Sequence, residues 1–281
     1  MHINDLPIGV FDSGLGGLTA VREIKRTLPG ENLLYFGDKG RLPYGTRSPE
    51  IIRKYACDDM NFLLTHSVKA VLVACGTVSS TAIDVLHKEF DVPVIGVVEP
   101  ACRKAVAHSK SGRIAVLATP STIRTGAFDK QLRALRPDAH VLGVGCPMFV
   151  PLVENGYIKR DCAVTRAIAS EYISCLVGFD PDVIILGCTH YPLIKDIIAD
   201  VSTELLGKPV TLIDSGSAAA DALNEHLVEN DLLRASRDGS RSYYVSDRPY
   251  DFSRTASLFL GEEAENVTQI DIEKYLYTPH A

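Results

Sequence analysis

The sequence predicts an α/β fold made of two similar, doubly wound lobes with parallel sheets and a cleft between them. Short apolar runs rich in β-branched residues alternate with amphipathic stretches, which is the order of strands and helices around a parallel sheet. Two of these runs, residues 70–74 and 183–186, lead into a cysteine that is followed within two positions by a threonine. The recurrence of a whole strand tip indicates two matching lobes that face one site, because open α/β sheets bind ligands at the carboxyl ends of their strands.

The first part of the chain has the elements of one complete lobe. A strand at residues 8–11 enters a glycine-rich turn, and the leucine, valine and isoleucine spacing after it predicts a helix. Ser48 is a suitable N-cap, with Pro49 at the first position of a long helix. Further strands are expected at 33–36, 70–74 and 92–96, with a helix over 78–90.

The pattern starts again near Glu99 and supplies a second set of elements. Strands are expected at 114–118, 141–144, 183–186 and 210–214, and helices around 128–132, 149–154 and 164–176. Asp-Ser-Gly occurs after the first strand and again at 214–216, which indicates that the chain has returned to the first lobe. We therefore expect residues 1–97 and 210–281 to form the first lobe and residues 98–209 the second, with a tail strand at 243–245, a helix to 260 and an edge strand near Val267.

Composition excludes several classes of protein. The chain has 281 residues, of which 46% are hydrophobic, and a formal net charge of −6, which argues against a nucleic-acid or anionic membrane partner. No apolar run approaches the length of a membrane span, and the first residues lack the pattern of a signal peptide. The seven cysteines are widely spaced and include no Cys-x-x-Cys, so we expect reduced thiols in the cytoplasm.

The two strand-tip cysteines, Cys75 and Cys188, are the candidate reactive groups. A thiolate is a base and a thiol can return a proton, so thiols on opposing lobes suit removal of a proton from one face of a carbon and its return to the other. That reaction inverts a stereocentre. Other interpretations stay open: each cysteine as a small apolar residue, Cys188 and His190 as half of a zinc site, and the glycine-rich turn as a phosphate loop or a plain tight turn.

Four ordered motifs resemble those of the glutamate racemases. They are Asp12-Ser13-Gly14-x-Gly16-Gly17, Gly37-Asp38-x-x-Arg41-x-Pro43-Tyr44-Gly45, Ala74-Cys75-x-Thr77 and Gly187-Cys188-Thr189-His190-Tyr191-Pro192. The resemblance extends from about Ile8 to Leu260 and includes residues 149–154. It implies an enzyme without cofactor or metal that racemises glutamate, a small-molecule substrate, for bacterial peptidoglycan, and that is usually a homodimer.

The resemblance also implies a role for individual residues. Cys75 would take the α-proton from the D-enantiomer and Cys188 from the L-enantiomer, with Asp12, His190 and Glu154 assisting the thiols. The positions that match substrate contacts are Asp12, Ser13, Tyr44, Gly45, Gly76, Thr77, Thr189 and His190.

Gly76 departs from the family pattern, which usually has an asparagine whose amide contacts the substrate. The alternatives are therefore a racemase for aspartate or another acidic amino acid, and a thiol-dependent lyase such as a decarboxylase on the same scaffold. A lyase of that kind needs one active thiol, so the presence of both cysteines disfavours it. A two-lobed binding protein without activity would have no use for thiols at both strand tips.

Overall fold

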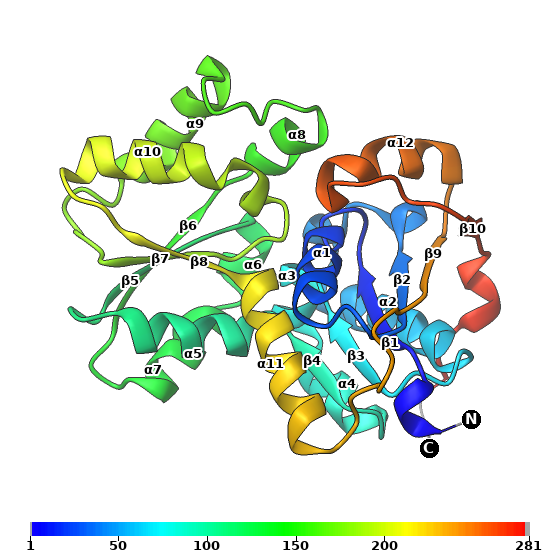
Figure 1. Ribbon diagram of the computed structural model, residues 1–281. Helices are drawn as coiled ribbons and strands as arrows, with labels where there is room; N and C mark the ends of the chain where they lie inside the picture. Colours follow the sequence, from blue (N-terminus) through cyan, green and yellow to red (C-terminus); the bar gives the residue numbers. More distant parts are fainter. Residues whose placement is uncertain (1, 279–281) are drawn as a thin grey trace.

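The computed structural model describes residues 2–278 and arranges them around two sheets whose paired strands are all parallel (Figure 1). The first sheet has the order β10-β9-β2-β1-β3-β4 and the second has the order β6-β5-β7-β8. When the tail strands β9 and β10 are left aside, the first sheet has the order β2-β1-β3-β4 and the second the order β6-β5-β7-β8. In both sheets the strands therefore lie side by side in the order second, first, third, fourth along the chain. The predicted pair of similar α/β lobes is confirmed.

The strands follow the apolar runs of the sequence closely. The first sheet contains β1 (Ile8–Asp12), β2 (Leu33–Gly37), β3 (Ala70–Val73), β4 (Val94–Gly96), β9 (Arg241–Val245) and β10 (Val267–Gln269). The second contains β5 (Arg113–Ala118), β6 (His140–Gly145), β7 (Val183–Leu186) and β8 (Thr211–Asp214). Every residue of β1, β2, β3 and β7 is buried, as expected for strands covered by helices on both faces.

The helices fall into two groups. Those that begin before β5 are α1 (Leu18–Thr27), α2 (Pro49–Leu64), α3 (Gly76–Thr81), α4 (Ile83–Glu89) and α5 (Val98–His108). Those that follow are α6 (Pro120–Arg124), α7 (Ala127–Leu135), α8 (Phe149–Glu154), α9 (Ala163–Ser174), α10 (Lys195–Leu206), α11 (Ser215–Glu229) and α12 (Pro249–Leu260). Short 3₁₀ turns lie at Ile3–Asp5, Lys39–Arg41, Tyr44–Thr46, Tyr191–Ile194 and Ile272–Tyr275. No helix among residues 2–278 is long and apolar enough to cross a bilayer.

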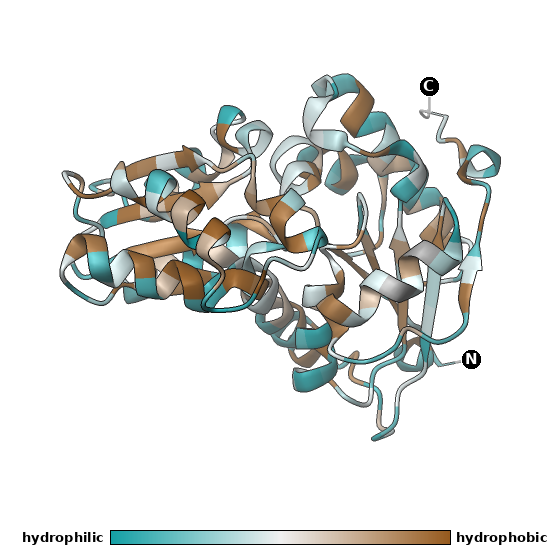
Figure 2. Ribbon diagram, turned by 90° about the horizontal axis from the view of Figure 1, so that it is seen from above, coloured by the Kyte–Doolittle hydropathy of each residue, from teal (hydrophilic) through white to brown (hydrophobic). Residues whose placement is uncertain are grey.

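Side chains of β1 alternate between two layers of helices. Ile8 and Val10 join a cluster that includes residues of α1, α11 and α12, whereas Phe11 joins a cluster with α2, α3 and α4. The first of these clusters continues into the second lobe through Ala115 and Leu186 of β5 and β7. The two lobes therefore share one apolar core, and apolar segments run through the strands of both when the molecule is seen from above (Figure 2).

The structure corrects two predictions about where elements lie. The strand at 211–214 pairs with β7, so the chain does not return to the first lobe at residue 210, and β8 completes the second sheet. A short strand with an N-capping aspartate has the same sequence signature in either lobe, and the winding order decides which sheet takes it. The helix expected over 78–90 is broken at Ala82, because the Thr-Val-Ser-Ser-Thr run before it is rich in weak helix formers.

Helix α11 lies between the lobes and connects them. It packs against α1 of the first lobe and α5 of the second (Figure 1). Lys104 of α5 forms a 2.7 Å ion pair with Asp221 of α11, and Arg103 forms a 2.8 Å pair with Glu225. The tail then returns to the first sheet, where β9 pairs with β2 and β10 with β9, as expected for an edge strand near Val267.

Candidate active site

Each lobe places one cysteine at the point where its winding changes direction. In the first sheet, the chain passes from β1 to its neighbour β2 on one side and later to β3 on the other side, so the direction of winding reverses between β1 and β3. In the second sheet the same reversal lies between β5 and β7. Cys75 follows β3, and Cys188 follows β7 after Gly187. The crevice at such a switch point is the usual ligand site of a doubly wound sheet.

These two crevices open into one cavity of about 470 Å³ between the lobes. Its volume is in the usual range for a small-molecule site. The cavity is lined by all eleven predicted site residues, namely Asp12, Ser13, Tyr44, Gly45, Cys75, Gly76, Thr77, Glu154, Cys188, Thr189 and His190. Both thiols are nearly buried, with exposed fractions of 5% for Cys75 and 7% for Cys188.

Cys75 is surrounded by groups of its own lobe. Its sulfur lies 3.4 Å from Oγ of Ser13, and the buried carboxyl of Asp12 is close enough to affect its titration. Burial raises the pKa of the Cys75 thiol to about 12, and the charge of Asp12 adds to the shift. Burial also raises the pKa of Asp12, although the N–H of Gly17, 2.8 Å from Oδ2, favours the ionised form. Cys75 is therefore a thiol at neutral pH.

Cys188 is accompanied by a basic residue instead. Its sulfur lies 3.8 Å from Nδ1 of His190, and Nε2 of the same ring lies 3.0 Å from Oε1 of Glu154. Burial alone would lower the pKa of His190, but its hydrogen bonds to Cys188 and Glu154 outweigh burial and raise the pKa to about 10. The ring is thus an imidazolium at neutral pH. A basic residue beside a sulfur, held in turn by a carboxylate, is the nucleophile–base arrangement of cysteine-dependent enzymes.

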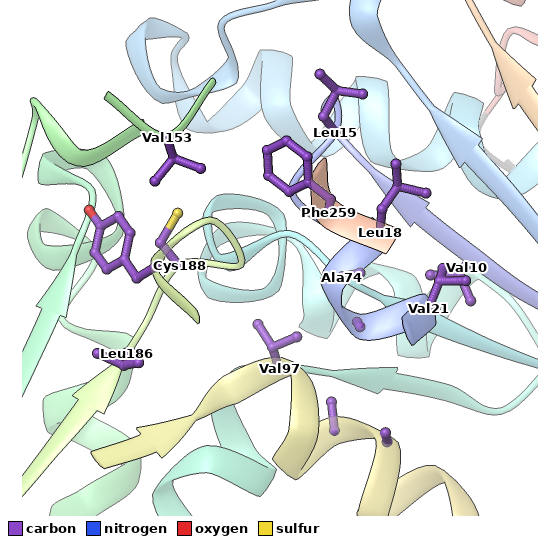
Figure 3. Close-up of a cluster of buried hydrophobic side chains, with 14 of the residues drawn as sticks. Val10, Leu15, Leu18, Val21, Ala74, Val97, Val153, Leu186, Cys188 and Phe259 are labelled. Atoms are coloured by element: carbon purple, nitrogen blue, oxygen red, sulfur yellow. The ribbon is translucent and has the colours of Figure 1, made fainter. Parts of the chain in front are cut away.

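The surroundings of Cys188 come from both lobes. It belongs to a buried cluster that contains Val153 of the second lobe and Leu15 and Phe259 of the first (Figure 3). The ring of Phe259 meets the ring of His190 edge to face, with centroids 5.2 Å apart. Such walls exclude water from the sulfur and so strengthen its electrostatic interactions.

The loop that carries Tyr44 and Gly45 is held by a cluster of buried charges. Arg41 donates to Asp38 at 2.5 Å, Asp58 at 2.7 Å and Asp59 at 2.6 Å, and all three carboxylates are fully buried. The hydroxyl of Tyr44 also donates to Asp38. This network fixes the outer wall of the cavity.

Gly76 allows a close contact between the two thiol-bearing segments. A Cβ at this position would lie 2.6 Å from the backbone oxygen of Gly187, which no real Cβ tolerates. The nearest side-chain atom to that point is Oγ1 of Thr122, at 3.7 Å. The close approach of the two lobes at this point therefore leaves no room for an asparagine side chain at position 76 without a shift of the Gly187 segment.

Sequence reasoning missed the cavity residues after β5. Thr119, Ser121, Thr122 and Arg124 line the second lobe's half of the cavity. Thr119 caps α6, and its Oγ1 lies 3.1 Å from Oγ1 of Thr122. The signal was present, because Thr-Pro-Ser-Thr directly after a strand places hydroxyls at the carboxyl edge of the second sheet, the counterpart of the edge where Asp12 and Ser13 lie in the first.

A family model described as Asp/Glu/Hydantoin racemase matches residues 8–223, which include both thiols and every strand except β9 and β10. The chain belongs to this family. Glutamate racemase from Geobacter metallireducens is 42% identical over 267 residues, covering 95% of this chain and 97% of the relative. Glutamate racemase from Chlorobaculum tepidum is 41% identical over 266 residues, covering 94% and 96%.

A solved racemase structure of the family supports the same assignment. The crystal structure of glutamate racemase from Francisella tularensis in complex with D-glutamate matches with a TM-score of 0.89 at 35% identity. The match covers 97% of this chain and 100% of that one. The fold of this chain is thus that of the glutamate racemases over nearly its whole length.

Proposed function

We propose that this chain is a cofactor-independent glutamate racemase that supplies D-glutamate for peptidoglycan. The observation that carries the proposal is that Cys75 and Cys188, from equivalent strand tips of two lobes, line one cavity. The relatives named glutamate racemase, which align along more than nine-tenths of the chain, support the choice of substrate. Two thiols on opposite sides of a carbon suit inversion by removal of a proton from one face and its return to the other.

The partners of the two thiols suggest how the reaction starts from L-glutamate. The sulfur of Cys188, beside the His190 imidazolium, takes the α-proton, while the Cys75 thiol gives a proton to the opposite face of the carbanion. After this step Cys188 holds a proton and Cys75 lacks one. D-glutamate reacts with that second form in reverse: Cys75, beside Asp12, takes the α-proton and Cys188 gives a proton to the opposite face.

Neutral hydrogen-bond donors supply most of the proposed substrate contacts. Ser13, Thr77 and Thr189 line the cavity from both lobes, together with Tyr44 and Gly45. Hydroxyl donors bind carboxylates without adding a fixed charge that would quench the thiolate. We assign to these residues the binding of the two carboxylates of glutamate.

Chiral chromatography tests the activity and the substrate together. The purified protein should convert L-glutamate to an equal mixture of enantiomers, with a higher kcat/KM for L-glutamate than for L-aspartate. Cys75→Ala and Cys188→Ala should each abolish racemisation, whereas Cys175→Ala, at an exposed thiol, should not. An equal or better kcat/KM for aspartate would show that the substrate assignment is wrong.

The proposal includes independence from metal and pyridoxal phosphate, a cytoplasmic location and a homodimer. Full activity should survive dialysis against a chelator, and the protein should carry no visible chromophore. Light scattering behind size-exclusion chromatography should give twice the mass of one chain. Loss of turnover after chelation, or a chromophore needed for activity, would contradict the first part, and a monomer mass would contradict the last.

A further inference from the structure

We infer that the glycine-rich turn of the first lobe positions the base of the second lobe, through Gly16 and Thr19. The inference rests on the proposed function, in which Cys188 and His190 move the α-proton. The residues that position Cys75 then come from its own lobe, whereas the positions of Cys188 and His190 depend on contact between the lobes.

Gly16 lies directly against the imidazole. A Cβ built on Gly16 would be 2.4 Å from Nδ1 of His190 and 2.5 Å from Oγ1 of Thr189. Nδ1 is the ring atom that faces the sulfur of Cys188 at 3.8 Å. Any side chain at position 16 must therefore displace the ring from the sulfur or push the lobes apart.

Thr19 fixes the backbone between the two functional side chains. Its buried Oγ1 lies 2.8 Å from the backbone oxygen of Thr189 and 2.9 Å from that of Gly16. A hydroxyl has one proton to donate, so these two carbonyls share it and are held together by it. Residues 188–190 lie between the end of the β7 pairing, where the N–H of Gly187 donates to the oxygen of Leu117 at 2.8 Å, and a 3₁₀ turn, so strand pairing does not restrain the backbone of Thr189. The bond from Thr19 supplies that restraint from the other lobe.

The corresponding supports of Cys75 lie within the first lobe. Asp12 is the last residue of β1 and Ser13 follows it, and β1 pairs with β3 of the same sheet, which leads into Cys75. A disturbance of the contact between Thr19 and Thr189 should therefore affect one thiol and spare the other. This difference between the thiols gives the inference a measurement independent of turnover.

The test is the rate at which iodoacetamide alkylates each cysteine at neutral pH, followed by mass spectrometry of peptides. In Thr19→Val, Cys188 should react about tenfold more slowly relative to Cys75, since losing one hydrogen bond to a buried carbonyl has an effect of about that size. In Gly16→Ala, Cys188 should also slow relative to Cys75, because the added Cβ displaces the His190 ring. Thr19→Ser keeps the hydroxyl and should react like the wild type. Thr27→Val is the matched control, because Thr27 Oγ1 bonds only within its own helix, at 3.0 Å to the oxygen of Glu23.

Racemisation is measured in the same variants. We expect kcat/KM to fall together with the alkylation rate of Cys188 and to recover in Thr19→Ser. Equal or faster alkylation of Cys188 in both Thr19→Val and Gly16→Ala, or equal slowing of both thiols, overturns the inference. Failure of the wild type to racemise glutamate would instead refute the proposed function, and the ratio of alkylation rates would still decide the positioning role.

Discussion

The carboxylate of Glu154 lies 3.0 Å from Nε2 of His190, and so joins a partly exposed group at the rim of the cavity to a buried ring. The ring contacts Cys188 with its other nitrogen. Carboxylate, imidazole and sulfur thus form a chain in which each group orients the next, the same logic as in other nucleophile–base–carboxylate sites. We propose that Glu154 acts on the reaction through His190.

Glu154→Gln should move the alkaline limit of activity. Hydrogen bonds to Cys188 and Glu154 raise the pKa of His190 to about 10, so the imidazolium is present at neutral pH and is lost as pH rises through that value. Removing the carboxylate charge lowers the pKa of His190, and the alkaline fall in kcat/KM should therefore begin at lower pH. Glu204→Gln, at an exposed glutamate paired with Arg166, is the control. An unchanged alkaline limb in Glu154→Gln would show that His190 does not need this partner.

Restoring the family's asparagine at position 76 should lower activity. The Cβ of Gly76→Asn would meet the backbone oxygen of Gly187, next to Cys188, so the segment must shift. A displacement of this kind costs ~10- to 100-fold in kcat/KM. Gly76→Ala carries the same Cβ without the amide and should lose a similar amount. A kcat/KM above that of the wild type in Gly76→Asn would mean that the amide matters more than the contact between the segments.

Arg41→Met should destabilise the protein strongly. It leaves the buried carboxylates of Asp38, Asp58 and Asp59 without their shared cation, and removal of one partner of a buried charge pair costs about 3–5 kcal/mol. The deficit should shrink at acid pH, because protonation removes the uncompensated charges. Urea unfolding measures it, with Arg26→Met as the control, since Arg26 is exposed in its pair with Glu23 and its loss should change stability by less than about 0.5 kcal/mol. Equal midpoints for the two variants would contradict this account.

The sequence predicted the strand tips well because their chemistry is local. A buried apolar run ends where a glycine or a polar residue begins, and parallel strands bring all their carboxyl ends to one edge. The sequence therefore suffices to place Asp12 and Cys75 at the carboxyl edge of the first sheet and Cys188 at the equivalent edge of the second. The resemblance to a known family added Glu154, which no local pattern singles out.

What the sequence could not predict depends on how the lobes meet. The bond from Thr19 to the backbone of Thr189 joins residues 170 positions apart, and no periodicity encodes it. The close approach of Gly76 to Gly187 is likewise a property of packing between the lobes. The same applies to the strand at 211–214, whose sheet is chosen by the partner available to β7 rather than by its own residues.

The central claim is that Cys75 and Cys188 act on opposite faces of the α-carbon, and initial turnover of L-glutamate in deuterated water tests it most directly. In deuterated water the thiol of Cys75, which donates to the product, carries deuterium from the solvent. Cys188 takes the proton of the substrate and delivers no deuterium back to that face. Early D-glutamate should therefore carry deuterium at the α-carbon, while recovered L-glutamate remains unlabelled. Extensive early deuterium in the recovered L-glutamate would mean that one base serves both faces, and would contradict the account.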